Sequence, residues 1–164
     1  MVYERILRSL SDTDQFGATL AKSLPDGSIV AMTGTLGAGK TRLVQAVAVA
    51  CGLDPSDITS PTFVLIQEYH GDRDICHFDL YRLECDAEFL NLGPDEYFES
   101  DGLTFLEWAD RFESLLPEER VTIRLDVLSP DERRVTVTAV GDRYQTFLRD
   151  LCEEQKIRER KPEA

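Results

Sequence analysis

Eight consecutive residues have the types and spacing needed to hold a chain of phosphate groups. Residues 34–41 read GTLGAGKT and match the pattern G-x-x-x-x-G-K-[ST] in full. Glycines let successive backbone N–H groups curl around phosphate oxygens, because no Cβ stands in the way. The lysine can reach the outer phosphates, and the last hydroxyl can bind Mg²⁺. The segment therefore predicts a nucleoside triphosphate site made by Gly34, Thr35, Leu36, Gly37, Ala38, Gly39, Lys40 and Thr41.

The surroundings of this segment strengthen the prediction. A short apolar run at 28–33 precedes it, and strong helical apolar spacing at 40–51 follows it. A strand, a glycine-rich turn and a helix are the required setting for a phosphate-binding loop. A helix that begins near Lys40 would add the partial positive charge of its N-terminus. A glycine-rich turn that binds nothing is disfavoured by this context.

Two acids end apolar runs elsewhere in the chain. Residues 75–79 read ICHFD and residues 103–107 read LTFLE, so Asp79 and Glu107 follow buried strands. In an open α/β sheet both would lie at the carboxyl edge, beside the phosphate loop. We expect Glu107 to hold Mg²⁺, directly or through water, and Asp79 to complete the metal shell or orient the attacking water. The two roles could be exchanged, and either acid could instead cap a helix or form an ion pair.

Two further residues are candidates for the same site. Thr62, in the TSPTF segment after the loop helix, could sense the outermost phosphate as switch segments do. Trp108 directly follows Glu107 and could lie near the nucleotide, anchor a partner or simply fill the core. Histidines His70 and His77 stand alone, so each is expected to be an ordinary structural residue.

Apolar spacing and turn residues predict the elements that position these groups. Ser11 is expected to cap the first helix, with Asp14 completing a capping box. The predicted strands are 2–7, 28–33, 63–69, 75–78, 103–106, 121–127 and 133–139, and the predicted helices are 11–24, 40–51, 86–92, 108–115 and 142–154.

This order predicts a three-layer α/β domain of the P-loop NTPase type. Its sheet is expected to have a mainly parallel centre with antiparallel hairpin additions, the hairpin of 121–127 and 133–139 forming one edge. Residues 1–154 are predicted to form a single domain, and 155–164 a charged, frayed tail.

Composition limits the partners. The formal net charge is -13, and the lysines are only Lys22, Lys40, Lys156 and Lys161. A large surface for nucleic acid needs clustered Lys and Arg, so direct tRNA or DNA binding is disfavoured. The apolar runs are too short to cross a bilayer and the N-terminus lacks a signal-peptide pattern, which predicts a cytoplasmic protein without membrane contact.

Four segments together resemble the TsaE (YjeE) family of small bacterial P-loop ATPases. They are GTLGAGKT at 34–41, TSPTF at 59–63, HFDLYRL at 77–83 and LEW at 106–108. The family is required for making threonylcarbamoyl-adenosine in tRNA. The resemblance implies a Mg²⁺-dependent ATPase of low intrinsic rate that resets or activates the TsaB–TsaD transferase pair and reaches tRNA only through it. It also implies that Lys40, Asp79 and Glu107 act in hydrolysis, while Trp108 and Thr62 belong to the ATP site.

Three other functions are weighed against this one. A small P-loop kinase for a nucleotide or metabolite fits the size and the loop, but no arginine-rich lid lies between 51 and 103. A GTP-driven switch needs an Asn-Lys-x-Asp segment, and the only asparagine, Asn91, precedes Leu92. A protein that holds ATP without hydrolysing it stays open. The sequence does not fix the oligomeric state.

Overall fold

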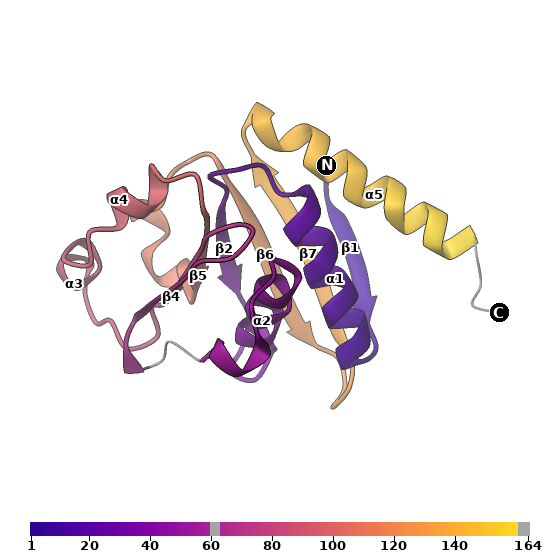
Figure 1. The fold of residues 1–164 in the computed structure, drawn as a ribbon, viewed down its shortest axis with the longest axis horizontal. Coiled ribbons are helices and arrows are strands. Elements are labelled where there is room, and N and C mark those ends of the chain that lie inside the picture. Colours follow the sequence, from indigo (N-terminus) through magenta and orange to yellow (C-terminus); the bar gives the residue numbers. More distant parts are fainter. Residues whose placement is uncertain (60–62, 161–164) are drawn as a thin grey trace.

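The computed structural model describes residues 1–59 and 63–160. Seven strands form one sheet in the spatial order β1-β7-β6-β2-β5-β4-β3, with helices on both faces (Figure 1). The strands are β1 (Tyr3–Leu7), β2 (Ile29–Thr33), β3 (Ile66–Tyr69), β4 (Ile75–Asp79), β5 (Leu103–Glu107), β6 (Arg120–Val127) and β7 (Arg133–Val140). The α-helices are α1 (Leu10–Ser23), α2 (Lys40–Ala50), α3 (Asp86–Leu90), α4 (Pro94–Phe98) and α5 (Gln145–Arg160).

The centre of the sheet is parallel. Strand β2 pairs in parallel with β5 and β6, and β5 pairs in parallel with β4. Strands β3 and β7 pair antiparallel with β4 and β6, and β1 pairs antiparallel with β7. The predicted mainly parallel sheet with antiparallel additions is therefore confirmed. Parallel strands end at the same edge, so β2, β4 and β5 deliver their last residues to one place.

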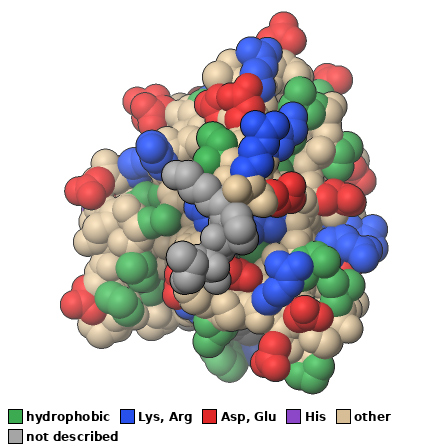
Figure 2. All heavy atoms as spheres, turned by 90° about the vertical axis from the view of Figure 1, so that its right-hand side faces the viewer, with side chains coloured by type: hydrophobic (Ala, Val, Ile, Leu, Met, Phe, Trp, Pro, Cys, Tyr) green, Lys and Arg blue, Asp and Glu red, His purple; other side chains and the backbone are tan. Residues whose placement is uncertain are grey.

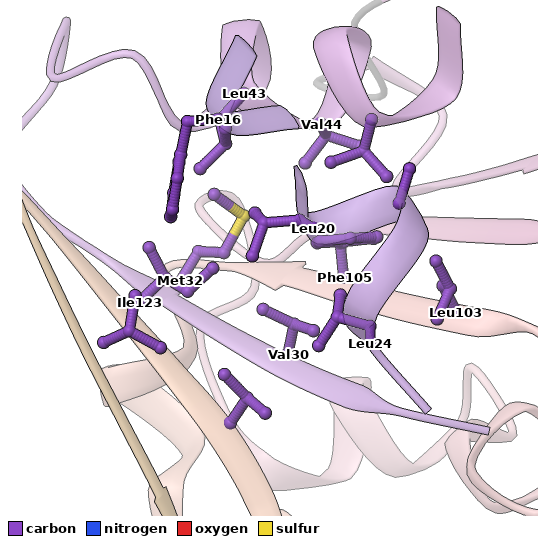
Figure 3. Packing of buried hydrophobic residues seen from close by; sticks show 14 of the residues in the cluster. Phe16, Leu20, Leu24, Val30, Met32, Leu43, Val44, Leu103, Phe105 and Ile123 are labelled. Carbon is purple, nitrogen blue, oxygen red and sulfur yellow. The ribbon is translucent and has the colours of Figure 1, made fainter. Parts of the chain in front are cut away.

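Successive side chains of β2 point alternately into two hydrophobic layers, one on each face of the sheet. Val30 and Met32 face the layer that α1, α2 and α5 cover, which also holds Phe105 of β5. Figure 3 shows these side chains packed against Leu20 and Leu43. Ile29 and Ala31 face the opposite layer, with residues of β4, α3 and the segment after β5. Because both faces are covered, the central strands are apolar throughout, as buried parallel strands are.

The alternation in 121–127 and 133–139 predicts that this hairpin forms one edge of the sheet, and that prediction is wrong. Strand β6 is bound on one side to β2, and β7 lies between β6 and the N-terminal strand. The register of β1 on β7 runs from Tyr3 opposite Val137 to Leu7 opposite Arg133. Tyr3 and Leu7 are buried, so β1 closes the core at this end and becomes the edge strand.

The first helix begins at a different serine from the predicted one. Ser9, not Ser11, is the N-cap, and its Oγ accepts the backbone N–H of Asp12 at 3.1 Å. Asp12 in turn accepts the N–H of Arg8 at 2.7 Å. The sequence offers S-x-x-D twice, and the earlier copy satisfies the amides left by the end of β1. Asp14, the acid of the later copy, pairs with Arg42 on α2.

Three other elements differ from prediction. Helix α3 ends at Leu90, and a separate helix, α4, follows with Pro94 at its first turn. Residues 109–115 form a kinked 3₁₀ segment instead of an α-helix, because Phe112 has non-helical dihedrals. Helix α5 continues past residue 154 to Arg160, where Arg158 binds Glu154 at 2.7 Å. No helix within 1–59 and 63–160 has the length and apolar character needed to span a membrane.

Gly17 allows α1 to lie directly on the helix of the phosphate loop. A Cβ at this position would stand 2.5 Å from the Cβ of Ala46 and 2.8 Å from its carbonyl carbon. Side chains do not approach so closely, so the two helix backbones could not keep their present separation. The position of α2, and of the loop from which it starts, therefore depends on the absence of a side chain here.

Replacing Gly17 by Ala is expected to lower the free energy of unfolding by about 1–3 kcal/mol, the usual cost of overpacking. Helix propensity alone would favour Ala by about 1 kcal/mol, so the sign of the change separates the two effects. Urea unfolding followed by circular dichroism measures it. The control is Ala18→Gly, on the exposed side of the same helix, which should lose about 1 kcal/mol from propensity alone. A Gly17→Ala variant at least as stable as the parent would contradict the packing argument.

Candidate nucleotide site

The segment 34–39 connects β2 to α2 at the edge where the parallel strands end. Gly34 has φ 138°, and a Cβ there would lie 2.4 Å from the carbonyl oxygen of Leu125, so only glycine fits. Gly37 and Gly39 also have positive φ. Gly39 is the N-cap of α2 and supplies no side chain to its first amides. Those N–H groups are therefore left for an anion, as phosphate-binding loops require.

Lys40 is folded back against its own loop. Its side chain is buried, and Nζ donates to the carbonyl oxygens of Gly34 at 2.6 Å and Thr35 at 3.1 Å. The ammonium also lies 3.9 Å from the ring centroid of Trp108, a cation–π distance. Burial lowers the pKa of Lys40, and nearby carboxylates, with Glu107 the largest, oppose that shift. The site thus holds a desolvated lysine whose charged form is favoured by its acidic neighbours.

Glu107 receives two hydrogen bonds on one oxygen. The hydroxyl of Thr41 lies 2.6 Å from Glu107 Oε1, and Nε2 of His77 lies 2.7 Å from the same atom. Glu107 and His77 are both buried. The hydroxyl predicted to bind magnesium is thus already in contact with the acid predicted to share that metal.

Asp79 lies beside Glu107 on the neighbouring strand. The two are register partners at the ends of β4 and β5, and Asp79 is also buried. Its Oδ1 accepts the backbone N–H of Tyr81 at 3.0 Å, which holds the turn after β4. Two carboxylates and the Lys40 ammonium therefore share one small, largely desolvated volume.

Trp108 follows Glu107 with its backbone in the left-handed region, at φ 61°. This conformation is unfavourable for a bulky residue, and such outliers concentrate at functional sites. It turns the indole towards Lys40 and against Tyr81, whose ring centroid is 5.0 Å away. The ring therefore forms a wall of the site and is not a plain core residue.

A cavity of about 420 Å³ gathers these groups. Leu36, Gly37, Ala38, Gly39, Lys40, Thr41, Asp79, Glu107 and Trp108 line it, together with Arg42, Gln45 and Tyr81. Gly34 and Thr35 do not line it but bind Lys40 through their carbonyls. Thr62 lies outside the described residues, so its predicted role stays a prediction. The remaining predicted residues come from three separate parts of the chain and meet at one sheet edge.

Sequence reasoning missed three residues of this region. His77 was expected to be an ordinary histidine, although it lies two positions before Asp79 and therefore faces the same side of β4. Tyr81 packs against Trp108 with its ring tilted by 45°, and although it lies in the HFDLYRL segment it was assigned no role from the sequence. Arg133 lies on β7 and contacts Ala38 and Gly37, which precede it in the chain by 95 and 96 positions. No spacing in the sequence could indicate these contacts.

Arg133 joins the phosphate loop to the β6–β7 turn. Its Nε donates to the carbonyl of Ala38 at 3.1 Å, and Nη2 to that of Gly37 at 3.4 Å. Its Nη1 donates to the carbonyls of Ser129 at 2.8 Å and Glu132 at 3.0 Å. The guanidinium thus binds the outward carbonyls of Gly37 and Ala38, while the backbone N–H of Ala38 donates to the carbonyl of Thr35 at 3.0 Å.

A second cavity, of about 360 Å³, adjoins the loop on the β6–β7 side. Apolar groups from β1, α1, α2 and β6 contribute to its walls, and polar groups stand at a few points. Leu7, Leu10, Thr13, Gly39, Leu43, Leu125, Pro130 and Arg133 are among its lining residues. Its size falls within the range of about 300–1,000 Å³ found for small-molecule sites.

The oxygen ligands present suit magnesium bound together with a nucleotide. Within the described residues, no group of three or more His, Cys, Asp and Glu side chains could hold a metal. Mg²⁺ is usually held by one or two carboxylates, substrate phosphates and waters, not by an all-protein cage. Thr41 and Glu107, with Asp79 next to them, match that pattern.

Comparisons with known proteins agree with this geometry. The family model for the threonylcarbamoyl adenosine biosynthesis protein TsaE matches residues 7–135. A tRNA threonylcarbamoyladenosine biosynthesis protein TsaE of Treponema pallidum is 40% identical over 132 residues, covering 80% of this chain and 97% of the relative. Its counterpart in Bacillus subtilis is 42% identical, covering 80% and 82%.

A solved structure extends the similarity to the fold. The crystal structure of YdiB from Bacillus subtilis superposes with a TM-score of 0.78 at 31% identity, and the match covers 94% of this chain and 97% of that one. The matched family region contains the phosphate loop, both strand-end acids and Trp108. The chain belongs to the TsaE family of threonylcarbamoyl adenosine biosynthesis proteins.

Proposed function

We propose that this protein is a magnesium-dependent ATPase of tRNA threonylcarbamoyl-adenosine synthesis, acting in the cytoplasm on a TsaB–TsaD transferase pair. The observation that carries the proposal is the convergence of Lys40, Thr41 and two strand-end carboxylates on one cavity beside the phosphate loop. Membership of the TsaE family supports the pathway, because relatives are named for that biosynthesis.

The residues divide the chemistry between them. Amides of 34–41 and the start of α2 would bind the phosphate oxygens. Lys40 would exchange the carbonyls of Gly34 and Thr35 for phosphate oxygens, which are stronger acceptors for an ammonium. Thr41 and Glu107 would hold Mg²⁺, which when bound neutralises charge on the phosphates. Asp79, beside them, would orient the attacking water, although the two carboxylates could exchange these roles.

The second cavity is our candidate for the base and ribose. It shares Ala38, Gly39 and Arg42 with the first cavity, so one nucleotide could extend from one cavity into the other. Its apolar lining from Leu7, Leu43 and Leu125 suits an aromatic base.

Charge supports an indirect route to tRNA. The formal net charge of the chain is -13. On the face near β1 and α5, basic and acidic side chains are mixed together (Figure 2). Such a mixture is unlike the continuous basic surface that tRNA phosphates require. We therefore propose that the transferase pair, and not this chain, contacts the tRNA.

Phosphate release from ATP tests the function directly. We expect slow release by the protein alone, stimulation by purified TsaB–TsaD without any phosphoryl acceptor, and none from Lys40→Ala under either condition. Transfer to a nucleotide or metabolite acceptor would favour the kinase alternative. Equal rates with and without the pair would remove the partner proposal while leaving hydrolysis intact.

Neutralising either strand-end acid should stop hydrolysis without preventing nucleotide binding. For Glu107→Gln and for Asp79→Asn we expect kcat to fall about 10²–10⁴-fold, the range for losing an acid–base or water-orienting group. Single-turnover phosphate release measures the effect. Asp110→Asn is the charge-matched control, since Asp110 acts on Lys40 only electrostatically and does not line the cavity. Asp110→Asn should hydrolyse ATP at about the rate of the parent. If Glu107→Gln or Asp79→Asn hydrolyses ATP no more slowly than Asp110→Asn, the role assigned to that acid is wrong.

Filling the second cavity should weaken ATP but not inorganic triphosphate. Thr13 of α1 lines this cavity, and Thr13→Tyr would occupy it without replacing any residue of the loop. We expect a higher Kd for ATP and an unchanged Kd for triphosphate, read from the fluorescence of Trp108, the single tryptophan. Thr19→Tyr, on the same helix outside the cavity, is the control. An equal loss of both ligands would place the base elsewhere.

A further inference from the structure

The Glu107 carboxylate is held on one side only. Thr41 and His77 both bind Oε1, at 2.6 and 2.7 Å. Among the described residues nothing donates a hydrogen bond to Oε2, and Glu107 lines the 420 Å³ cavity. A carboxylate fixed through one oxygen by two donors keeps its other oxygen directed to a single place.

His77 is placed for this contact by the register of the sheet. It pairs with Phe105 on β5, while Asp79 pairs with Glu107 two positions on. Alternation puts His77, Asp79, Phe105 and Glu107 on the same face, the one beneath α2. The imidazole therefore reaches diagonally across the strands, and it is 1% exposed.

The imidazole is not explained by apolar packing alone. Because Nε2 lies 2.7 Å from a carboxylate oxygen, this nitrogen carries the hydrogen. Nδ1 is buried and, within the described residues, has no hydrogen-bond partner. A buried polar atom without a partner is unfavourable, so packing alone would favour an apolar side chain here. What histidine adds is the Nε2–H that Glu107 receives.

We propose that His77 is a positioning residue of the nucleotide site. Its Nε2–H holds Glu107 Oε1, so the carboxylate presents Oε2 to the magnesium-bound phosphates or the attacking water. The role rests on the proposed function in that it acts through Glu107. His77 is not among the residues that line the 420 Å³ cavity, so in this role it would touch neither nucleotide nor metal.

Two substitutions separate positioning from folding. His77→Leu removes the donor and the unpartnered Nδ1, whereas His77→Gln keeps an N–H near the Nε2 position. We expect His77→Leu to lower kcat about 10- to 100-fold, the usual effect of removing a partner of a metal-binding group. It should also raise the Mg²⁺ concentration needed for half-maximal activity, with KM for ATP unchanged and the protein still folded by circular dichroism. His77→Gln should restore most of the loss, and His70→Leu, at an exposed position, should match the parent.

Nitrogen NMR tests the contact without hydrolysis. The chain has 2 histidines, so a ¹⁵N-histidine spectrum contains two rings, and His70→Gln assigns them. We expect His77 to carry its hydrogen on Nε2, with Nδ1 unprotonated, and its Nε2–H signal to shift in Glu107→Ala. Full kcat and an unchanged Mg²⁺ requirement in His77→Leu, or a hydrogen on Nδ1 instead, would overturn the proposal.

The outcome stays separable from the proposed function. If the parent protein hydrolyses no ATP with or without TsaB–TsaD, the ATPase proposal fails. The role of His77 is then decided by nucleotide binding, followed through Trp108 at increasing Mg²⁺. A higher Mg²⁺ requirement in His77→Leu that His77→Gln corrects supports positioning, and identical Mg²⁺ requirements refute it.

Discussion

The site depends on a balance between one buried ammonium and two buried carboxylates. Removing charges from water is costly, and breaking such a group by deleting one member costs more than the group contributes as a whole. Lys40 meets this constraint through two carbonyls of its own loop, the face of Trp108 and the field of Glu107 and Asp79. A triphosphate brings negative charge to the same place, so its arrival would relieve a positive group held in a poorly solvated position.

The fold makes this balance possible by bringing distant segments to one edge. Strands β2, β5 and β4 are adjacent and parallel, so the loop after β2 and the acids that end β5 and β4 meet without long excursions of the chain. The layer under α1 and α2 is filled by Phe16, Leu20, Val30, Met32 and Phe105 (Figure 3). A well-packed core limits how far these strands can shift, which keeps the carboxylates and the ammonium in register.

Groups specified by local pattern could be predicted from sequence. The phosphate loop depends on residues within eight positions, and the placement of Asp79 and Glu107 beside it followed from their position at the ends of apolar strands. The central strands were also predictable, since both of their faces are buried and their residues are apolar.

Features that depend on long-range contacts could not be predicted. The pairing of β1 with β7 and the reach of Arg133 to Ala38 join residues more than ninety positions apart. Two equivalent S-x-x-D sequences competed for the first helix, and only the end of β1 selects between them. His77 was overlooked because its partner lies on another strand, although its alternation with Asp79 was visible.

Arg133 has a consequence for the kinetics of ligand capture. Free glycine-rich loops sample many conformations, and a ligand that orders one loses affinity to the entropy of that ordering. Here the Arg133 guanidinium donates hydrogen bonds to the carbonyls of Gly37 and Ala38 in the loop. The same side chain also binds the carbonyls of Ser129 and Glu132 in the β6–β7 turn. Much of the loop's freedom is therefore already lost when the chain folds. An incoming triphosphate would bind a loop that already has its binding conformation. The association rate would therefore be set by diffusional encounter and not by rearrangement of the loop.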